Sequence, residues 1–168
     1  MQIRTETPAD VAAIGQVVDA AFRGAPHSDG TEAAIVEALR AAGALTLSLV
    51  AQADGRPGGR IVGHVAFSPV TVNGAGADLM GLGPLAVLPE AQGRGIGTAL
   101  VRAGLARLGA RGCVVLGDPG FYRRFGFAPQ PGLWLPGVPP DCFMALRRGR
   151  PLPEGAVAYH PAFATDVA

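Results

Sequence analysis

Lysine is absent from this chain of 168 residues, and cysteine, aromatic residues and net charge are all scarce. Without lysine the chain cannot carry a Walker A loop, which needs one directly after its last glycine. The two cysteines, Cys113 and Cys142, lie too far apart for a usual zinc pair and form no disulfide framework. We therefore expect no metal site. The formal charge of +1 argues against nucleic-acid binding, which usually needs a strong basic excess.

Long apolar runs are missing as well. Each run is broken by Gly, Pro or Arg well short of the roughly 18 residues that a membrane span needs. No basic-then-apolar leader opens the sequence. We therefore expect a soluble cytoplasmic protein with no membrane partner, whose hydrophobic content of 49% is enough for the core of one domain.

Glycine, by contrast, is abundant, and three glycines alternate at the predicted start of a helix. Gly93, Gly95 and Gly97 follow an apolar strand predicted over residues 79–87. Glycines leave the backbone bare, so that successive N–H groups can close on a ligand. The first N–H groups of a helix have no intrahelical partner, and the helix dipole favours an anion there. No carboxylate occurs from Ala91 to Gly117, which predicts that a bound phosphate supplies the negative charge.

A dinucleotide-binding turn is one alternative for this phosphate site. Its Gly-x-Gly-x-x-Gly pattern is only partly met, because Thr98 stands at the third position. Residues 88–92 also separate the strand from the glycines, whereas the dinucleotide turn allows almost no spacer. Asp118 lies about twenty residues on, where a ribose-binding acid would be expected. A nucleotide-dependent oxidoreductase therefore stays open as an alternative.

The stretch from Gln92 to Gly97 (Gln-Gly-Arg-Gly-Ile-Gly) resembles the Gln/Arg-x-x-Gly-x-Gly/Ala signature of the GNAT superfamily of N-acetyltransferases. Residues 85–87 upstream, residues 121–127 (Phe-Tyr-Arg-Arg-Phe-Gly-Phe) and the order of the predicted elements resemble the same family across nearly the whole chain. Residues 159–163 (Tyr-His-Pro-Ala-Phe) resemble the ending of a bacterial subgroup of predicted acetyltransferases.

The resemblance implies one GNAT domain over residues 1–168, with residues 149–168 as its C-terminal extension. The implied fold class is α+β: a mixed, mostly antiparallel sheet with a bulged and splayed central strand, flanked by about four helices. Acetyl-CoA is the implied co-substrate. The residues that the resemblance assigns to its binding are Leu85, Ala86, Val87, Gln92, Gly93, Arg94, Gly95, Ile96, Gly97 and Thr98.

The sequence itself also predicts a bulge in the central strand. Residues 79–87 are apolar on both faces and should lie inside the sheet, yet they contain Gly83-Pro84. Because proline cannot donate to a strand ladder, a central position requires a β-bulge there. The resemblance implies the same bulge, and with it a slot for the pantetheine arm.

Other patterns predict the remaining elements. Strands are expected over residues 3–5, 45–50, 61–67, 113–117, 143–146 and 157–159, and helices over residues 8–22, 31–42, 97–108 and 119–125. Asn73-Gly74 predicts a hairpin, with a loop that we expect to continue through Ala77. Residues 129–141 are expected to form an ordered loop or lid, and His64 an ordinary strand histidine.

For catalysis the resemblance assigns Tyr122 as the general acid that protonates the departing thiolate, while packing against its aromatic neighbours is the other interpretation. The general base stays open among Asp118, Glu32, His27 and water. Gly81 stands where some protein-lysine acetyltransferases of the family have a glutamate, which puts a histone-type mechanism in doubt. We expect a small-molecule amine or a peptide as acceptor, and a homodimer is possible. The alternative function is a non-catalytic acyl-CoA-binding or sensor module.

Overall fold

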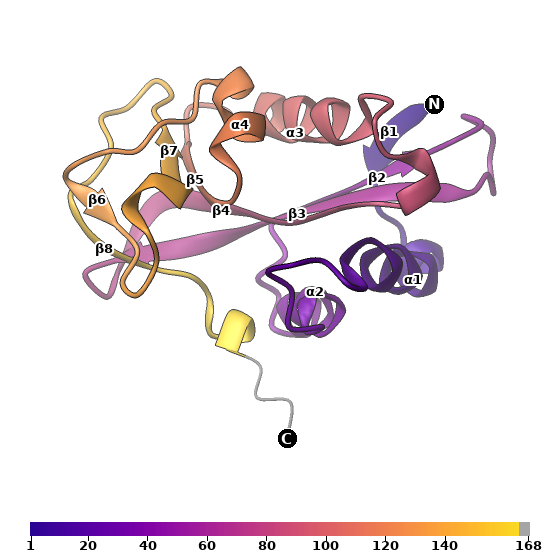
Figure 1. Cartoon of the computed structure of the whole chain (residues 1–168), viewed down its shortest axis with the longest axis horizontal. Coiled ribbons are helices and arrows are strands. Elements are labelled where there is room, and N and C mark those ends of the chain that lie inside the picture. The colour runs from indigo at the N-terminus through magenta and orange to yellow at the C-terminus, as the bar shows by residue number, and fades with distance from the viewer. Residues whose placement is uncertain (165–168) are drawn as a thin grey trace.

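The protein is an α+β fold built on one mixed sheet, and a computed structural model describes its residues 1–164 (Figure 1). The strands are β1 (Gln2–Thr5), β2 (Leu47–Gln52), β3 (Ile61–Val72), β4 (Ala75–Val87), β5 (Gly112–Leu116), β6 (Leu133–Trp134), β7 (Phe143–Leu146) and β8 (Gly155–Ala158). The helices are α1 (Val11–Phe22), α2 (Glu32–Ala41), α3 (Ile96–Arg107) and α4 (Pro119–Tyr122). The predicted fold class is confirmed.

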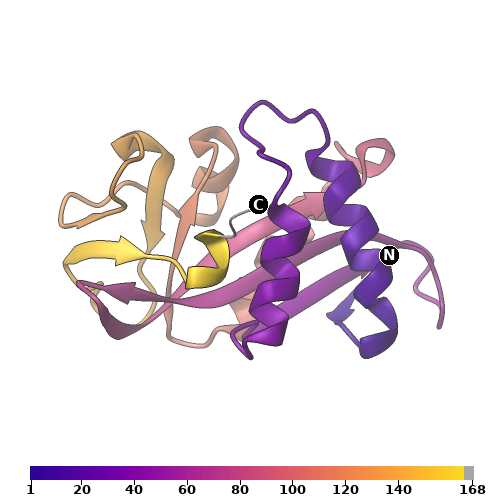
Figure 2. The same cartoon turned by 90° about the horizontal axis from the view of Figure 1, so that it is seen from below.

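The sheet runs in the order β1-β2-β3-β4-β5-β7, and β8 pairs with both β3 and β6. Along the main path only β4 and β5 are parallel; the other neighbours are antiparallel. Helices α3 and α4 lie on one face of the sheet, and α1 and α2 on the other (Figure 1). Figure 2 looks at the α1/α2 face and shows the last turn, Pro161–Ala164, on that face beside α2.

Local sequence signals explain where the first helix begins. Thr7 and Asp10 form a capping box, in which the Asp10 carboxylate accepts the backbone N–H of Thr7 at 2.7 Å. Pro8 stands at the first position of the short 3₁₀ turn that leads into α1. The helix then buries Ile14, Val17 and Val18 against the sheet.

The predicted bulge in β4 is confirmed. Val65 on β3 pairs with Leu85, but Phe67 pairs with Leu82, so β4 carries one extra residue in the Gly83-Pro84 region. On its other side β4 pairs with β5 only from Leu79 to Leu82. Beyond Leu116 the chain still bonds on the β7 side, where the Gly117 N–H donates to the Cys142 carbonyl at 3.0 Å. The two parallel strands therefore part after Leu82, and we refer to the region between residues 83–87 and residues 116–117 as the fork.

Two sequence-based expectations are wrong at the β3–β4 hairpin. The expected loop through Ala77 is absent, because Val72 pairs with Ala75 and leaves only Asn73-Gly74 as the turn. Both turn residues have positive φ, 51° and 79°, as a tight hairpin turn requires. Strand β3 also extends beyond Phe67 to Val72, since Pro69 is accommodated opposite Met80 at an exposed position.

Short strands before and after β7 complete the sheet. Residues 129–141, expected to be a loop or lid, contain the short strand β6, which pairs with β8. Strand β8 pairs with the end of β3 through Thr71 and Val72. Residues 165–168 of the expected C-terminal extension lie outside the described residues. Within residues 1–164, no helix has the length and apolar character that crossing a bilayer requires.

Candidate donor site beside the bulged strand

The loop between β4 and α3 presents a run of backbone N–H groups that the protein does not use. Gly93 and Gly95 have φ of 73° and 80°, and Gly95 is the N-cap of α3. Within the described chain, none of the N–H groups from Gly93 to Thr98 donates to another residue; the first helical bond runs from Ala99 to Gly95. The first turn of α3 carries no acid. Bare amides at a helix N-terminus without a carboxylate are suited to bind an anion.

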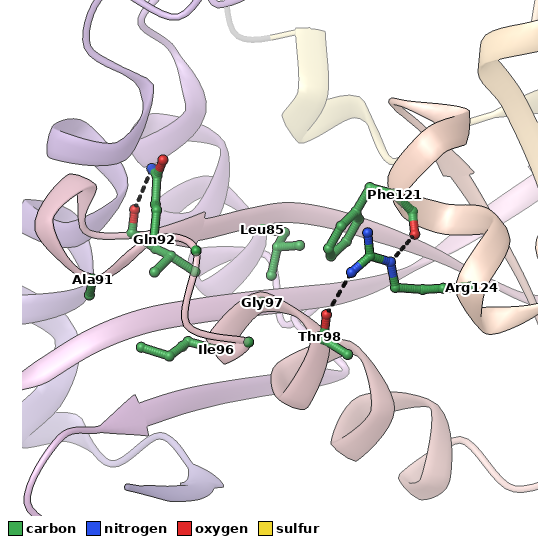
Figure 3. A pocket seen from close by; sticks show the side chains of 11 residues that line it. Leu85, Ala91, Gln92, Ile96, Gly97, Thr98, Phe121 and Arg124 are labelled. Carbon is green, nitrogen blue, oxygen red and sulfur yellow. Dashed lines mark hydrogen bonds between the residues drawn. The ribbon is translucent and has the colours of Figure 1, made fainter.

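A cleft of about 480 Å³ opens beside this loop (Figure 3). Its walls come from the end of β4, the glycine loop, the start of α3 and α4 with the turn after it: Leu85, Val87, Ala91, Gln92, Gly93, Gly95, Ile96, Gly97, Thr98, Phe121 and Arg124. Eight of the ten residues that sequence reasoning assigned to the donor therefore lie together. Gly97 lines the cleft without a side chain, and a Cβ there would lie 3.6 Å from Phe121 Cζ.

Two assigned residues, Ala86 and Arg94, do not line the cleft. Ala86 is buried on the opposite face of β4, where it pairs with His64 of β3. Arg94 is exposed to solvent between the two positive-φ glycines. Gln92 lies in the wall, but its side-chain amide donates to the Val87 carbonyl at 3.0 Å. It therefore ties the glycine loop to the end of β4.

Sequence reasoning missed three lining residues, which are Ala91, Phe121 and Arg124. Arg124 Nε donates to the Phe121 carbonyl at 2.8 Å, and Arg124 Nη1 donates to Thr98 Oγ1 at 3.3 Å (Figure 3). The guanidinium lies 4.6 Å from the centre of the Phe121 ring. It adds a positive charge beside the unused amides of α3. The spacing of three residues between Phe121 and Arg124 on a helical turn is the signal that could have found the pair.

Tyr122 lies behind the cleft wall. Its side chain is 9% exposed and packs edge-on against Phe121 and Phe127, at centroid distances of 4.9 and 5.9 Å. The ring also covers Gly117, where a Cβ would lie 2.6 Å from Tyr122 Cε2. Burial raises the pKa of the Tyr122 phenol, and Cys113 and Asp118 act in the same direction. Tyr122 is therefore a neutral phenol beside the fork.

The three side chains considered as general bases lie in different places. Asp118 is the N-cap of α4, and its carboxylate accepts the Gly120 N–H at 2.9 Å. His27 is exposed in the loop between α1 and α2. Glu32, in the first turn of α2, is half-buried and lines a separate hollow of about 300 Å³ beside that loop. Among the described residues, none of the three lines the cleft by the glycine loop, although the Asp118 carbonyl accepts the N–H of the lining residue Phe121 at 3.1 Å.

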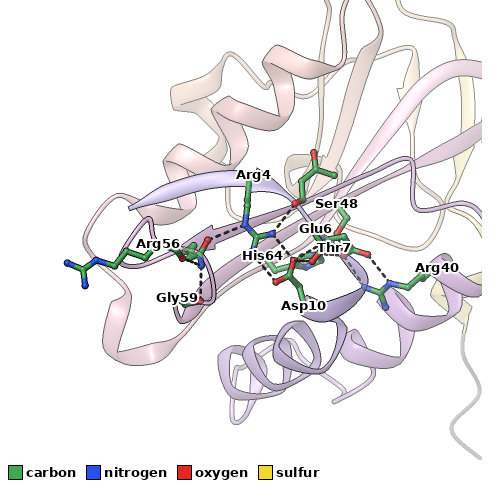
Figure 4. A network of polar contacts seen from close by, with 11 residues as sticks. Arg4, Glu6, Thr7, Asp10, Arg40, Ser48, Arg56, Gly59 and His64 are labelled. Carbon is green, nitrogen blue, oxygen red and sulfur yellow. Dashed lines mark hydrogen bonds and ion pairs between the residues drawn. The ribbon is translucent and has the colours of Figure 1, made fainter.

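His64 is more than an ordinary strand histidine, because it belongs to a buried polar chain (Figure 4). Ser48 Oγ donates to the Glu6 carboxylate and lies 2.7 Å from His64 Nε2. Because the single Ser48 proton goes to Glu6, His64 Nε2 carries the hydrogen and donates to Ser48. His64 Nδ1 is then an unprotonated nitrogen, buried and without a hydrogen-bond partner among the described residues. Burial lowers the pKa of His64 to about 4.

Comparisons with known proteins agree with this geometry. A family model described as an acetyltransferase (GNAT) domain matches residues 45–129. The uncharacterized N-acetyltransferase YhbS of Escherichia coli is 45% identical over 130 residues, which cover 76% of this chain and 73% of the relative.

Solved structures give the same result. A GNAT family acetyltransferase from Brucella melitensis, in complex with acetyl-CoA, is 52% identical with a TM-score of 0.84 and covers 96% of this chain and 97% of its own. The structure of YhbS from Escherichia coli, in complex with CoA, is 37% identical with a TM-score of 0.82 and covers 98% of this chain and 92% of its own.

Proposed function

The chain belongs to the GNAT family of acetyltransferases, and from this membership we propose that it transfers an acetyl group from acetyl-CoA to a primary amine within a ternary complex. The observation that carries the proposal is the run of unused backbone N–H groups from Gly93 to Thr98 beside the fork. A folded protein rarely leaves so many donors without a partner unless a ligand or water takes them.

The residues present fit acetyl-CoA. The amides from Gly93 to Thr98 would hold the diphosphate, since they combine bare backbone with the positive end of the α3 dipole. Arg124 adds a cation beside them. Leu85, Val87 and Phe121 give the cleft an apolar wall along β4 that suits an uncharged pantetheine arm. When bound, acetyl-CoA supplies a thioester whose carbonyl carbon is the electrophile.

In this proposal an amine of the acceptor displaces the sulfur directly, with no covalent enzyme intermediate. The C–N bond forms and the C–S bond breaks, while the amine passes one proton to water and the sulfur gains one. Tyr122 is proposed to supply the proton to the sulfur, because burial keeps its phenol protonated. Backbone N–H groups at the β4 bulge are proposed to donate to the carbonyl oxygen. The acceptor is proposed to be a small-molecule amine or a peptide.

Calorimetric titration with acetyl-CoA tests the donor site. Gly97→Leu should abolish measurable binding, because the new side chain would fill the space between Phe121 and β4. Gly76→Leu is the matched control: it makes the same change at an exposed position on β4 with nothing within 4 Å of a Cβ, and binding should stay within about twofold of wild type. Equal binding of acetyl-CoA by both variants would refute the assignment of the donor site to this cleft.

An acetylation screen over small amines and peptides, corrected for donor hydrolysis, tests the transfer. With an acceptor found, Tyr122→Phe should lower kcat by about 100-fold or more while the Kd for acetyl-CoA stays within about twofold. An equal loss in kcat and in affinity for acetyl-CoA would refute the role of Tyr122 as the general acid. Binding with no transfer to any amine would instead favour the non-catalytic acyl-CoA-binding or sensor module.

A further inference from the structure

Tyr159, from the C-terminal segment, fills the space over Gly81 on β4. A Cβ at position 81 would lie 2.6 Å from Tyr159 Cε1 and 2.9 Å from Cδ1. These separations are far below ordinary van der Waals contact, so a side chain at position 81 and the Tyr159 ring exclude each other. The ring therefore stands where the β4 side chain would otherwise be.

Gly81 lies at the closed end of the fork, where β4 and β5 are still paired. Gly81 and Leu82 are the last two residues of β4 that pair with β5, opposite Val114 and Val115. The next residue of β5, Leu116, is 45% exposed, although the four residues before it are buried. On β4 the donor cleft is lined by Val87 and Leu85, and Leu85 lies three residues from Leu82 at this end of the fork.

Tyr159 lies on the far side of the sheet from the donor cleft. Leu82 pairs with Phe67, whose ring contacts α3, so these residues face α3. Gly81 is the neighbouring residue on β4 and faces the opposite way, toward α1, α2 and the C-terminal segment (Figure 2). The donor cleft and Tyr159 therefore approach the end of the fork from opposite faces.

Two buried hydroxyls at this place have no hydrogen-bond partner among the described residues. They are Tyr159 Oη and Oγ of Ser68, the β3 residue directly opposite Gly81. An unsatisfied buried hydroxyl destabilises the folded protein, because it has lost its hydrogen bonds to water. Burial raises the pKa of Tyr159. The nearby Cys113 and Tyr122 act in the same direction and the backbone N–H of Leu116 opposes them, so the hydroxyl stays protonated beside the fork. Buried hydroxyls without a partner are suited to form a hydrogen bond with a polar atom of a ligand.

The segment that carries Tyr159 is held firmly. Ala158, immediately before it, pairs with Thr71 of β3. Immediately after it, His160 Nδ1 accepts the Ala162 N–H at 3.0 Å. Phe163 packs against the Tyr159 ring at a centroid distance of 4.9 Å. A ring fixed on both sides is suited to act as a wall.

We propose that Tyr159 closes the acyl end of the donor site: its ring limits the acyl group to about the size of acetyl, and its hydroxyl donates to the acyl carbonyl oxygen. This inference rests on the proposed function. It assigns the choice of acyl group to a side chain from the C-terminal segment, and the glycine at position 81 is what makes room for it.

Calorimetric titration with CoA, acetyl-CoA and butyryl-CoA tests the proposal without an acceptor. Wild type should bind acetyl-CoA at least about 100-fold more tightly than butyryl-CoA, because butyryl has two more methylenes and a tight pocket discriminates by at least about tenfold for each. Tyr159→Ala should reduce this preference to about threefold or less. Tyr159→Leu is the second variant in case the alanine variant does not fold, and it should also reduce the preference because leucine is shorter than the phenol ring.

Two control variants separate the effect of the Tyr159 ring from the effect of its hydroxyl and from a change in the packing of the C-terminal segment. Tyr159→Phe keeps the ring and should keep the preference for acetyl, while acetyl-CoA binding weakens by about fivefold and CoA binding does not change. Phe163→Leu replaces one aromatic neighbour of Tyr159 by another apolar side chain but keeps the Tyr159 ring and hydroxyl, and it should keep a clear preference for acetyl.

The outcomes separate the two proposals. No binding of any of the three ligands to wild type would refute the proposed function itself. Binding without a chain-length preference, or a preference that survives Tyr159→Ala or Tyr159→Leu, would overturn the role of Tyr159 and leave the donor site standing.

Discussion

Acidification should destabilise the protein through His64. The imidazole is fully buried in the native state, and burial lowers its pKa from 6.5 to about 4. The nearby Glu6 carboxylate opposes the shift and Arg40 supports it. Between pH 6.5 and pH 4 the unfolded chain therefore binds a proton at this position that the native protein does not bind.

The sign and size of the effect follow from this difference. Stability rises with pH wherever the unfolded state holds more protons, so the free energy of unfolding should fall as the pH drops from 6.5 to about 4. At about 1.4 kcal/mol per pKa unit, the full loss through His64 is about 3 kcal/mol, of which about 2 kcal/mol should be reached at pH 5. Below pH 4 both states are protonated and this contribution stops changing.

Urea denaturation at pH 7 and pH 5 measures the loss, with His64→Gln as the matched variant. Glutamine can still donate to Ser48, but it does not titrate. The loss between the two pH values should be about 2 kcal/mol larger in wild type than in His64→Gln, since the carboxylates titrate in both proteins. A difference below about 0.5 kcal/mol would refute the buried neutral imidazole, and with it the unprotonated Nδ1.

Two further predictions concern stability at neutral pH, each checked by urea denaturation. Gly104→Ala should lower the free energy of unfolding by about 1 to 3 kcal/mol, because its Cβ would lie 2.3 Å from Phe67 Cε2. Gly15→Ala, on α1 with nothing within 4 Å, should instead raise it by about 0.5 to 1 kcal/mol. Asp10→Asn should lower it by about 1.5 to 3 kcal/mol, because the carboxylate accepts from Arg4 at 2.7 and 2.9 Å; an unchanged midpoint would contradict this.

The glycine loop could be predicted from the sequence because its signals are local. Alternating glycines, a helix start without an acid and an apolar strand just before it all lie within residues 79–98. The β4 bulge was predictable for the same reason, since Gly83-Pro84 inside a buried strand admits few other geometries. These features depend on the backbone of one short stretch.

The hairpin was mispredicted because tertiary pairing overrode local composition. The small and polar residues 74–78 have the composition of a loop, and Pro69 suggests a strand end. In the structure the ladder between β3 and β4 continues past both, down to the pair Val72 and Ala75. The alternation of apolar and polar residues along one strand does not show how far hydrogen bonding to a neighbouring strand extends it.

The closed end of the fork could not be predicted from the sequences of β4 and β5 alone. It includes the ring of Tyr159, which follows β8 near the end of the chain. At position 81 the sequence shows only a glycine in an apolar strand, and the absence of a side chain there suggests only the loss of the glutamate that some family members have. The structure shows that the room over Gly81 is filled by the Tyr159 ring. Since the ring and a Cβ at position 81 exclude each other, β4 and the C-terminal segment constrain one another. Gly81→Ala should therefore displace Tyr159, and calorimetric titration with acetyl-CoA and butyryl-CoA should show the same reduced preference for acetyl that we expect of Tyr159→Ala.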